Sequence, residues 1–230
     1  MSIAENIAQV RERMARAARR AGRDPNQITL MAVSKTVEPA RIREAYAAGV
    51  RVFGENRVQE FAEKAALRDL SGAEWHLIGH LQTNKANKAA EIFSAVDSVD
   101  SVKLARKLDA AAEKDVPVLI EINIGGEEAK SGVRADSSEL EELLRAAAEF
   151  ERLEIRGLMT IPPFTEDPEE ARPYFRRLRQ LRDEIFGRKL PRVLMDVLSM
   201  GMSHDFEVAI EEGSTCVRVG TAIFGERQKP

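Results

Sequence analysis

Residues 28–35 read Ile28-Thr29-Leu30-Met31-Ala32-Val33-Ser34-Lys35. This short apolar run is typical of a buried strand, and it ends in a lysine. Similar apolar runs recur along the chain and predict eight strands, centred on residues 30–33, 50–53, 75–78, 93–96, 118–122, 155–159, 193–198 and 216–219. A helical pattern fills each of the seven intervals, at about 39–48, 57–68, 83–91, 101–114, 137–150, 168–186 and 203–212.

The regular alternation of strands and helices predicts the fold. Such alternation indicates parallel strands joined by right-handed crossovers. Eight units within about 200 residues favour a closed (β/α)₈ barrel of the TIM type over an open doubly wound sheet. One more helix precedes the barrel, because Ile3, Ile7, Val10 and Met14 recur at helical spacing. We expect a single domain over residues 1–230, with the N-terminal helix at about 2–21 and the barrel at about 28–225.

Composition is that of a globular protein, with 43% hydrophobic and 32% charged residues. The formal net charge of -3 does not favour nucleic acid as a partner. The N-terminus lacks the apolar core of a secretory signal, and no run approaches the roughly 18 apolar residues of a membrane span. The single cysteine, Cys216, has no partner for an intramolecular disulfide, which fits a reducing compartment. We therefore expect a cytoplasmic protein that does not enter membranes.

Polar residues follow nearly every predicted strand. They are Lys35, Gly54-Glu55-Asn56, Gly79-His80, Asp97, Asn123, Met159-Thr160, Ser199-Met200-Gly201 and Arg218-Val219-Gly220-Thr221. The C-terminal ends of barrel strands carry the active sites of this fold. The convergence therefore predicts a functional site at that end of the barrel.

Lys35 is the candidate nucleophile of this site. A free lysine has a pKa of roughly 10.4, so about one amine in several thousand is neutral at pH 7. Desolvation lowers that pKa and makes imine formation with a carbonyl practical. The alternative is a lysine that only extends toward solvent or forms a salt bridge at the strand end.

Two segments near the C-terminus are suited to binding a phosphate. Ser199-Met200-Gly201-Met202-Ser203 precedes an amphipathic stretch, so we expect Ser203 to cap a helix whose N-terminus binds an anion. Gly220-Thr221 offers a similar arrangement after the last strand, where barrels often bind phosphate. Ordinary helix capping is the alternative for either segment. An amine and a phosphate cradle together predict an aldehyde-bearing phosphate ligand, with pyridoxal 5′-phosphate (PLP) as the leading candidate.

Arg218 lies within an apolar strand, where an unpaired guanidinium is costly. It either points inward at a ligand ring or forms a structural ion pair with an acid such as Asp196. An arginine opposite a pyridine nitrogen disfavours protonation of that nitrogen and weakens the ring as an electron sink.

His76 and His80 are four residues apart without the glutamate of a metalloprotease motif, so we expect no zinc site. Their roles, and that of Tyr46, stay open.

Six segments in order resemble the pyridoxal phosphate homeostasis protein family, relatives of the N-terminal barrel of alanine racemase. They are AVSKT (32–36), FGENRVQE (53–60), WHLIGHLQTNK (75–85), GLMT (157–160), LSMGMS (198–203) and VRVGTAIFG (217–225). The resemblance covers essentially the whole chain.

This resemblance implies a (β/α)₈ barrel with PLP bound covalently as an imine on Lys35. It implies phosphate contacts from Ser199, Ser203, Gly220 and Thr221, with Arg218 facing the pyridine nitrogen and Asn56 near the ring. Met159 and Met200 complete the predicted cofactor-binding set, with no catalytic or metal-binding residue. Members of the family are understood to buffer or deliver PLP in vitamin B6 homeostasis without established turnover.

The alternative is a PLP-dependent amino-acid racemase or a related enzyme. A two-base racemase needs a second acid or base opposite the imine, which alanine racemases supply as a tyrosine from a further domain and a partner subunit. Here Tyr46 and Tyr174 fall in predicted helices away from the strand ends, and the chain ends soon after the eighth strand. We therefore expect a monomeric PLP carrier with apo PLP-dependent enzymes as recipients.

Overall fold

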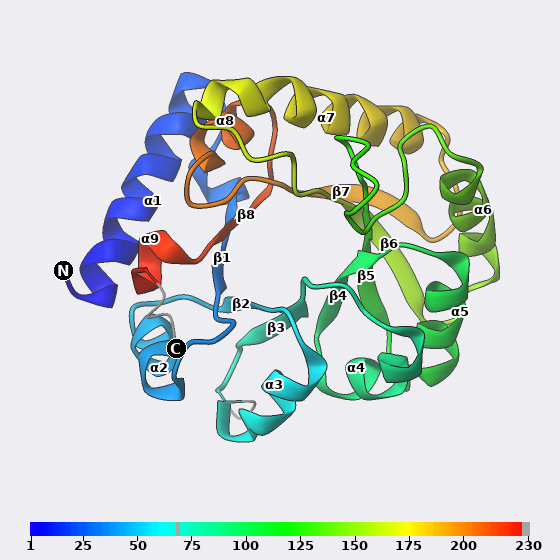
Figure 1. Cartoon of the computed structure of the whole chain (residues 1–230), viewed down its shortest axis with the longest axis horizontal. Coiled ribbons are helices and arrows are strands. Elements are labelled where there is room, and N and C mark those ends of the chain that lie inside the picture. The colour runs from blue at the N-terminus through cyan, green and yellow to red at the C-terminus, as the bar shows by residue number, and fades with distance from the viewer. Residues whose placement is uncertain (68–69, 227–230) are drawn as a thin grey trace.

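Eight parallel strands form a closed barrel in the computed structural model, which describes residues 1–67 and 70–226 (Figure 1). The strands follow one another around the ring in chain order, and the last pairs with the first. The strands are β1 (Thr29–Val33), β2 (Val52–Glu55), β3 (Glu74–Leu77), β4 (Ala95–Val99), β5 (Val116–Glu121), β6 (Leu153–Met159), β7 (Val193–Ser199) and β8 (Cys216–Val219).

Helices surround the barrel, one in each interval between strands (Figure 1). They are α2 (Pro39–Ala47), α3 (Val58–Glu63), α4 (Ala86–Ile92), α5 (Val102–Ala111), α6 (Ser138–Ala146), α7 (Arg172–Gly187) and α8 (Phe206–Glu211), with α1 (Ile3–Arg20) before β1 and α9 (Thr221–Phe224) after β8. Short 3₁₀ turns are η1 (Pro25–Gln27), η2 (Ala65–Leu67), η3 (Thr83–Lys85), η4 (Ala147–Glu149) and η5 (Pro168–Ala171). The predicted barrel and its additional N-terminal helix are confirmed; the short helix α9 was not predicted.

The main core lies between the barrel and its helices, because each strand turns one set of apolar side chains outward. An aromatic group on one side illustrates the packing. Phe53 stacks on Trp75 with ring centroids 4.8 Å apart, and Phe61 contacts both Trp75 (4.7 Å) and Phe93 (4.9 Å). These contacts join β2 and β3 to α3 and to the residue that follows α4.

The interior of the barrel is closed in the middle by apolar side chains. Met31, Ile78 and Cys216 form a small buried cluster of their own, separate from the main core. Valines pack against it from three strands: Val33, Val52 and Val197. The barrel is therefore a packed structure with two separate ends and not a channel.

Alternation along the strands identifies the side chains at the C-terminal end of the interior. Val197 and Cys216 belong to or contact the interior cluster. Because side chains two positions apart share a face, Ser199 and Arg218 also point inward, one layer nearer the C-terminal end. The buried Arg218 predicted from sequence thus faces the inside of the barrel.

Helix α1 packs against α8, α9 and α2 on the outside of the barrel (Figure 1). A capping box between Ser2 and Glu5 begins the helix, and Arg13 donates to Glu207 of α8 at 2.6 Å. At 18 residues α1 is the longest helix, but charged side chains cover its outer face. Among the residues that the structure describes, none of the helices has the length and apolarity needed to cross a membrane.

Candidate functional site

Lys35 lies in a tight turn directly after β1, and its side chain is half-buried. The N–H of Val37 donates to Ser34 O at 3.1 Å and closes the turn. Ser34 is fully buried, and its N–H donates to Gly54 O of the neighbouring strand at 2.9 Å. The start of the turn is thus fixed to the barrel wall, so the position of Lys35 at the end of β1 is determined by the sheet.

Arg218 is the buried cation of this end of the barrel. It donates from Nη1 to the carbonyl and hydroxyl oxygens of Ser199, both at 2.7 Å, and from Nη2 to Thr160 O at 2.7 Å. Burial lowers the pKa of this guanidinium, while nearby groups including the Asp97 and Asp205 carboxylates oppose the shift. Arg218 is therefore held as a fixed positive group across the ends of β6 and β7.

The loop after β7 contacts the backbone of Arg218. Met200 is fully buried in the main core, and its N–H donates to Cys216 O at 3.1 Å. Gly201 has a φ of +93°, and its carbonyl accepts the Arg218 N–H at 2.9 Å. A Cβ on Gly201 would lie 2.5 Å from that of Ala209, so the loop requires glycine to approach α8 closely.

Ser203 does not cap the next helix, which corrects the expectation from sequence. Helix α8 begins three residues later at Phe206, with Asp205 at the N-cap position. Asp205 instead accepts the Met202 N–H at 2.6 Å within the loop. The Ser203 hydroxyl accepts the Ala222 N–H at 3.2 Å, so it joins the β7 loop to the first turn of α9.

Gly220 and Thr221 lie at the start of α9, beside the turn that carries Lys35. Thr221 is exposed and Gly220 half-buried. The space beside Gly220 is bounded by Val33 of β1, with a distance of 3.5 Å from a built Cβ to Val33 Cβ. The two segments predicted to bind a phosphate are therefore adjacent to each other, and the second is adjacent to β1.

The sequence-based alternative for Arg218, an ion pair with Asp196, is wrong. Asp196 accepts hydrogen bonds from Arg156, at 2.9 Å to Nε and by a second contact to Nη2. Both belong to the opposite, N-terminal end of the barrel. Asp196 lies three residues before Ser199 on β7, toward the N-terminal end of the barrel, and its carboxylate is bonded there to Arg156.

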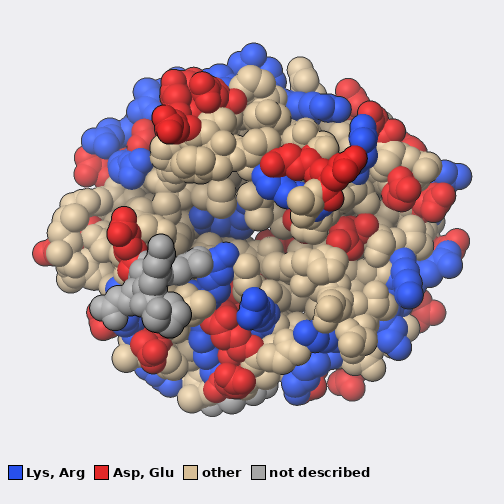
Figure 2. Space-filling model, in the orientation of Figure 1, with Lys and Arg blue, Asp and Glu red and all other residues tan. Residues whose placement is uncertain are grey.

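A cavity of about 410 Å³ adjoins the site at the C-terminal ends of β2 and β3. Its lining includes the half-buried Asn56, together with His80 and Lys85. A Cβ on Gly79 would lie 2.4 Å from Asn56 O, so the backbone after β3 lies directly on the backbone after β2. Figure 2 shows the corresponding face, hollowed at its centre, with Lys or Arg side chains visible in the hollow.

Met159 and Glu121 are neighbours in register at the ends of β6 and β5. Met159 is fully buried. Glu121 accepts a hydrogen bond from Ser131 on Oε1 at 2.8 Å, while its other oxygen is buried without a partner among the described residues. Burial raises the pKa of this carboxyl. Glu121 thus adds a buried, partly unsatisfied carboxyl group to this end of the barrel.

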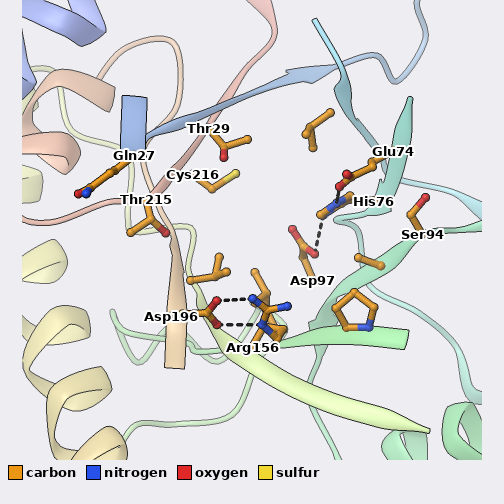
Figure 3. Close-up of a pocket in the computed structure, with 15 residues that line it drawn as sticks. Gln27, Thr29, Glu74, His76, Ser94, Asp97, Arg156, Asp196, Thr215 and Cys216 are labelled. Carbon is orange, nitrogen blue, oxygen red and sulfur yellow. Dashed lines mark hydrogen bonds and ion pairs between the residues drawn. The ribbon is translucent and has the colours of Figure 1, made fainter. Parts of the chain in front are cut away.

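A second cavity of about 340 Å³ opens at the N-terminal end of the barrel (Figure 3). His76 and Asp97 meet there at 3.0 Å, with Glu74 3.7 Å from the other ring nitrogen of His76. The Arg156–Asp196 pair lies across the cavity from them (Figure 3). The apolar middle of the barrel separates this cavity from Lys35 and Arg218.

The C-terminal end has the groups needed to hold a phosphorylated aldehyde. A half-buried amine, a buried guanidinium and two adjacent glycine-containing loops meet there, and a buried carboxyl oxygen lacks a partner. Sequence reasoning missed the contribution of Lys64 and Glu60, which contact the turn around Lys35. Their spacing of four residues on a predicted helix was the available signal.

The chain is similar to known proteins over its whole length. The family model of the alanine racemase N-terminal domain matches residues 3–228. The chain is 50% identical to a pyridoxal phosphate homeostasis protein of Aquifex aeolicus, over 99% of this chain and 100% of that one. It is 46% identical to the protein of the same name from Escherichia coli K12, over 98% and 97% of the two chains.

Solved structures are also similar to this chain. PipY of Synechococcus elongatus with PLP bound superposes with a TM-score of 0.83 at 38% identity, over 97% of this chain and 100% of that chain. An alanine racemase from Corynebacterium glutamicum matches with a TM-score of 0.73 at 22% identity, over 98% of this chain and 61% of that chain. The second likeness shows the fold alone.

Proposed function

The chain belongs to the pyridoxal phosphate homeostasis protein family, and from this premise we propose that it binds PLP at the C-terminal end of its barrel. The PLP aldehyde forms a covalent imine bond with Lys35 Nζ, and the protein holds, buffers and delivers the cofactor. The observation that carries the proposal is the meeting of Lys35, Arg218 and two adjacent glycine-containing loops at one end of the barrel.

Each predicted residue has a role in this proposal. Ser203, Gly220 and Thr221 contact the phosphate at the start of α9, where the Ser203 hydroxyl already joins the two loops. Ser199 has its hydroxyl hydrogen-bonded to Arg218, so its contribution includes fixing that side chain. Asn56 lies near the ring from the side of the adjoining cavity, and the buried Met159 and Met200 support the walls of the site.

The bond to Lys35 needs no further reactant. With PLP present, the neutral Lys35 amine would bond to the aldehyde carbon, and the carbonyl oxygen would leave as water with the two amine hydrogens, without any electron donor or acceptor. When bound, PLP supplies an aldehyde carbon that exchanges between amines and a pyridine ring able to accept electrons. An amine on a recipient protein can therefore replace Lys35, which is the chemical basis for delivery.

A carrier rather than an enzyme is proposed because of Arg218 and the positions of the tyrosines. Three protein acceptors hold the Arg218 guanidinium in place, and a cation beside the pyridine nitrogen disfavours its protonation. Tyr46 lies on α2 and donates to Ser71 O at 2.8 Å, and Tyr174 lies on α7. Neither is at a strand end, so neither is placed to serve as a second base opposite the imine.

We also propose that the protein is a cytoplasmic monomer and that apo PLP-dependent enzymes receive its cofactor. The buried thiol of Cys216, present as a free cysteine, supports a reducing compartment.

An absorbance spectrum with and without borohydride tests the proposal. We expect an imine band in the purified protein incubated with PLP, and a pyridoxyl mass on the peptide containing Lys35 after reduction. Lys35→Ala should lose the band, whereas Lys85→Met, a change in the lining of the adjoining cavity, should keep it. An unchanged band in Lys35→Ala would refute the assignment of the attachment site.

A further inference from the structure

The turn that carries Lys35 is fixed from the outside by α3 and the residue that follows it. Glu60 accepts the Thr36 N–H on Oε1 at 2.5 Å, on the C-terminal side of Lys35. Lys64 donates from Nζ to Ser34 O at 2.9 Å, on its N-terminal side. Lys64 also donates to Glu60 at 2.9 Å, so one ion pair contacts both neighbours of Lys35.

Thr36 needs such support because its backbone is in an unfavourable conformation. Its φ is +60°, a region that β-branched residues rarely adopt. Thr36 is the third residue of the turn closed by the Val37 N–H, a position at which glycine is the usual choice when φ is positive. Strained backbone of this kind persists only where surrounding contacts impose it, and it concentrates at functional sites.

Lys64 is committed to this role by its own surroundings. Its side chain is only 10% exposed, and its three contacts to Ser34 O, Glu55 and Glu60, each at 2.9 Å, match the three donors of an ammonium group. Burial would raise the pKa of Glu60, but hydrogen bonds from Lys64 and from the Thr36 N–H outweigh it and lower that pKa. Lys64 thus has all three donor positions engaged by protein oxygens and is unsuited to react with an aldehyde.

Glu55 completes the arrangement on the side of the barrel wall. It is fully buried at the end of β2, and its Oε1 accepts both the Ser34 hydroxyl at 2.7 Å and Lys64. Burial raises the pKa of Glu55. Lys64 therefore joins a helix, a strand end and the turn at one point.

We propose that Glu60 and Lys64 are positioning residues that hold the strained turn at Thr36 and thereby aim Lys35 at the aldehyde of its ligand. This inference rests on the proposed attachment of PLP to Lys35. Bond formation between an amine and a carbonyl depends on their alignment, and a displacement of about 1 Å can cost on the order of 10²-fold in rate. Loss of either residue slows formation of the bond without lowering the affinity for the phosphate group, which other loops bind.

The experiment compares two ligands and four proteins: the wild type, Lys64→Met, Lys64→Arg and a control. The rate of growth of the imine band with PLP reports alignment. The affinity for pyridoxamine 5′-phosphate, which lacks the aldehyde, reports phosphate and ring binding alone. Lys88→Met is the control, since Lys88 is an exposed lysine of α4 whose partner is Glu91 at 2.7 Å.

Lys64→Met should slow the imine band by about 10- to 100-fold and change pyridoxamine 5′-phosphate affinity by less than about threefold. Lys64→Arg, which keeps the charge and donors, should recover part of the rate, and Lys88→Met should equal the wild type. Equal losses for both ligands, or an unchanged rate, would overturn the inference. No imine in the wild type would instead refute the proposed function, and this inference with it.

Glu60→Ala, which removes the acceptor of the Thr36 N–H, keeps the test decisive if Lys64→Met does not fold, because the Glu60 side chain is partly exposed at 23%. It should slow the imine band in the wild-type background and do so less in a Thr36→Gly background, where glycine removes the strain that Glu60 opposes. Equal slowing in both backgrounds would show that Glu60 does not act through the turn.

Discussion

Folding raises the pKa of His76 and so changes its protonation near neutral pH. Burial lowers the pKa of His76, but the carboxylates of Asp97 and Glu74 outweigh burial and raise it from 6.5 to about 9. The folded protein therefore holds a proton that the unfolded chain releases between these two values. The stability contributed by this group is complete below pH 6.5 and is lost as the pH rises through about 9.

We expect the free energy of unfolding to fall by up to about 3 kcal/mol between pH 6.5 and pH 9.5 on account of His76. Urea denaturation of the wild type and of His76→Asn across this range measures it, because the difference between the two curves isolates one group. His80→Asn is the matched control, since the His80 side chain is 56% exposed beside Asp100. Parallel curves for wild type and His76→Asn would contradict the assignment.

Cys216 should be unreactive in the folded protein. Burial raises the pKa of its thiol to about 12, so the reactive thiolate is scarce at pH 8. We expect no labelling by iodoacetamide in buffer and complete single labelling in urea, followed by mass spectrometry. Fast labelling of the folded chain would mean that the middle of the barrel opens readily.

Cys216 and Arg218 show what the sequence could predict at the scale of single residues. The sequence places Cys216 in an apolar run, and in the structure the cysteine is free and buried. The acceptors of Arg218 could not be predicted from sequence, because two of the three are backbone carbonyls, which every residue possesses. Pairing with Asp196 was a reasonable hypothesis from charge, but that carboxylate lies at the other end of the barrel and pairs with Arg156.

At the scale of elements, the strands were predictable because each is a short apolar run between polar segments. The local register between neighbouring strands was not predictable. The pairing of β6 with β7 shifts between Ile155 and Gly157, and a Cβ on Gly157 would lie 1.8 Å from Val197 O. Helix α9 was missed because its four residues are too few for a periodic pattern.

The first turn of α9 is the element on which phosphate binding can be tested. Thr221→Val removes a hydroxyl and keeps the shape of an exposed side chain. Loss of one charge-assisted hydrogen bond costs about 1.5–3 kcal/mol, so PLP affinity should fall roughly ten- to a hundredfold. Titration with pyridoxal, which lacks the phosphate, is the comparison, and its affinity should hardly change. Equal weakening of both ligands would leave Thr221 with a structural role only.

At the scale of the whole molecule, the carrier hypothesis predicts binding without appreciable turnover. The holo-protein, incubated with single enantiomers of amino acids, should show optical inversion and keto-acid formation well below about one turnover per second. Absence of a well-placed general base typically costs about 10²–10⁴-fold in rate, and the two tyrosines lie on outer helices. Racemisation of any amino acid at an ordinary enzymatic rate would favour the racemase alternative.

The closed ring of strands has a consequence for behaviour in crowded solution. From β1 through β8 and back, each strand has a hydrogen-bonded neighbour on both sides. Open sheets expose an edge to which strands of other molecules can add, and this is a common route to aggregation. Closure removes that edge. The proposed carrier role requires a protein that stays dispersed when it is abundant, and within the described residues this barrel offers its copies no free strand edge on which to polymerise.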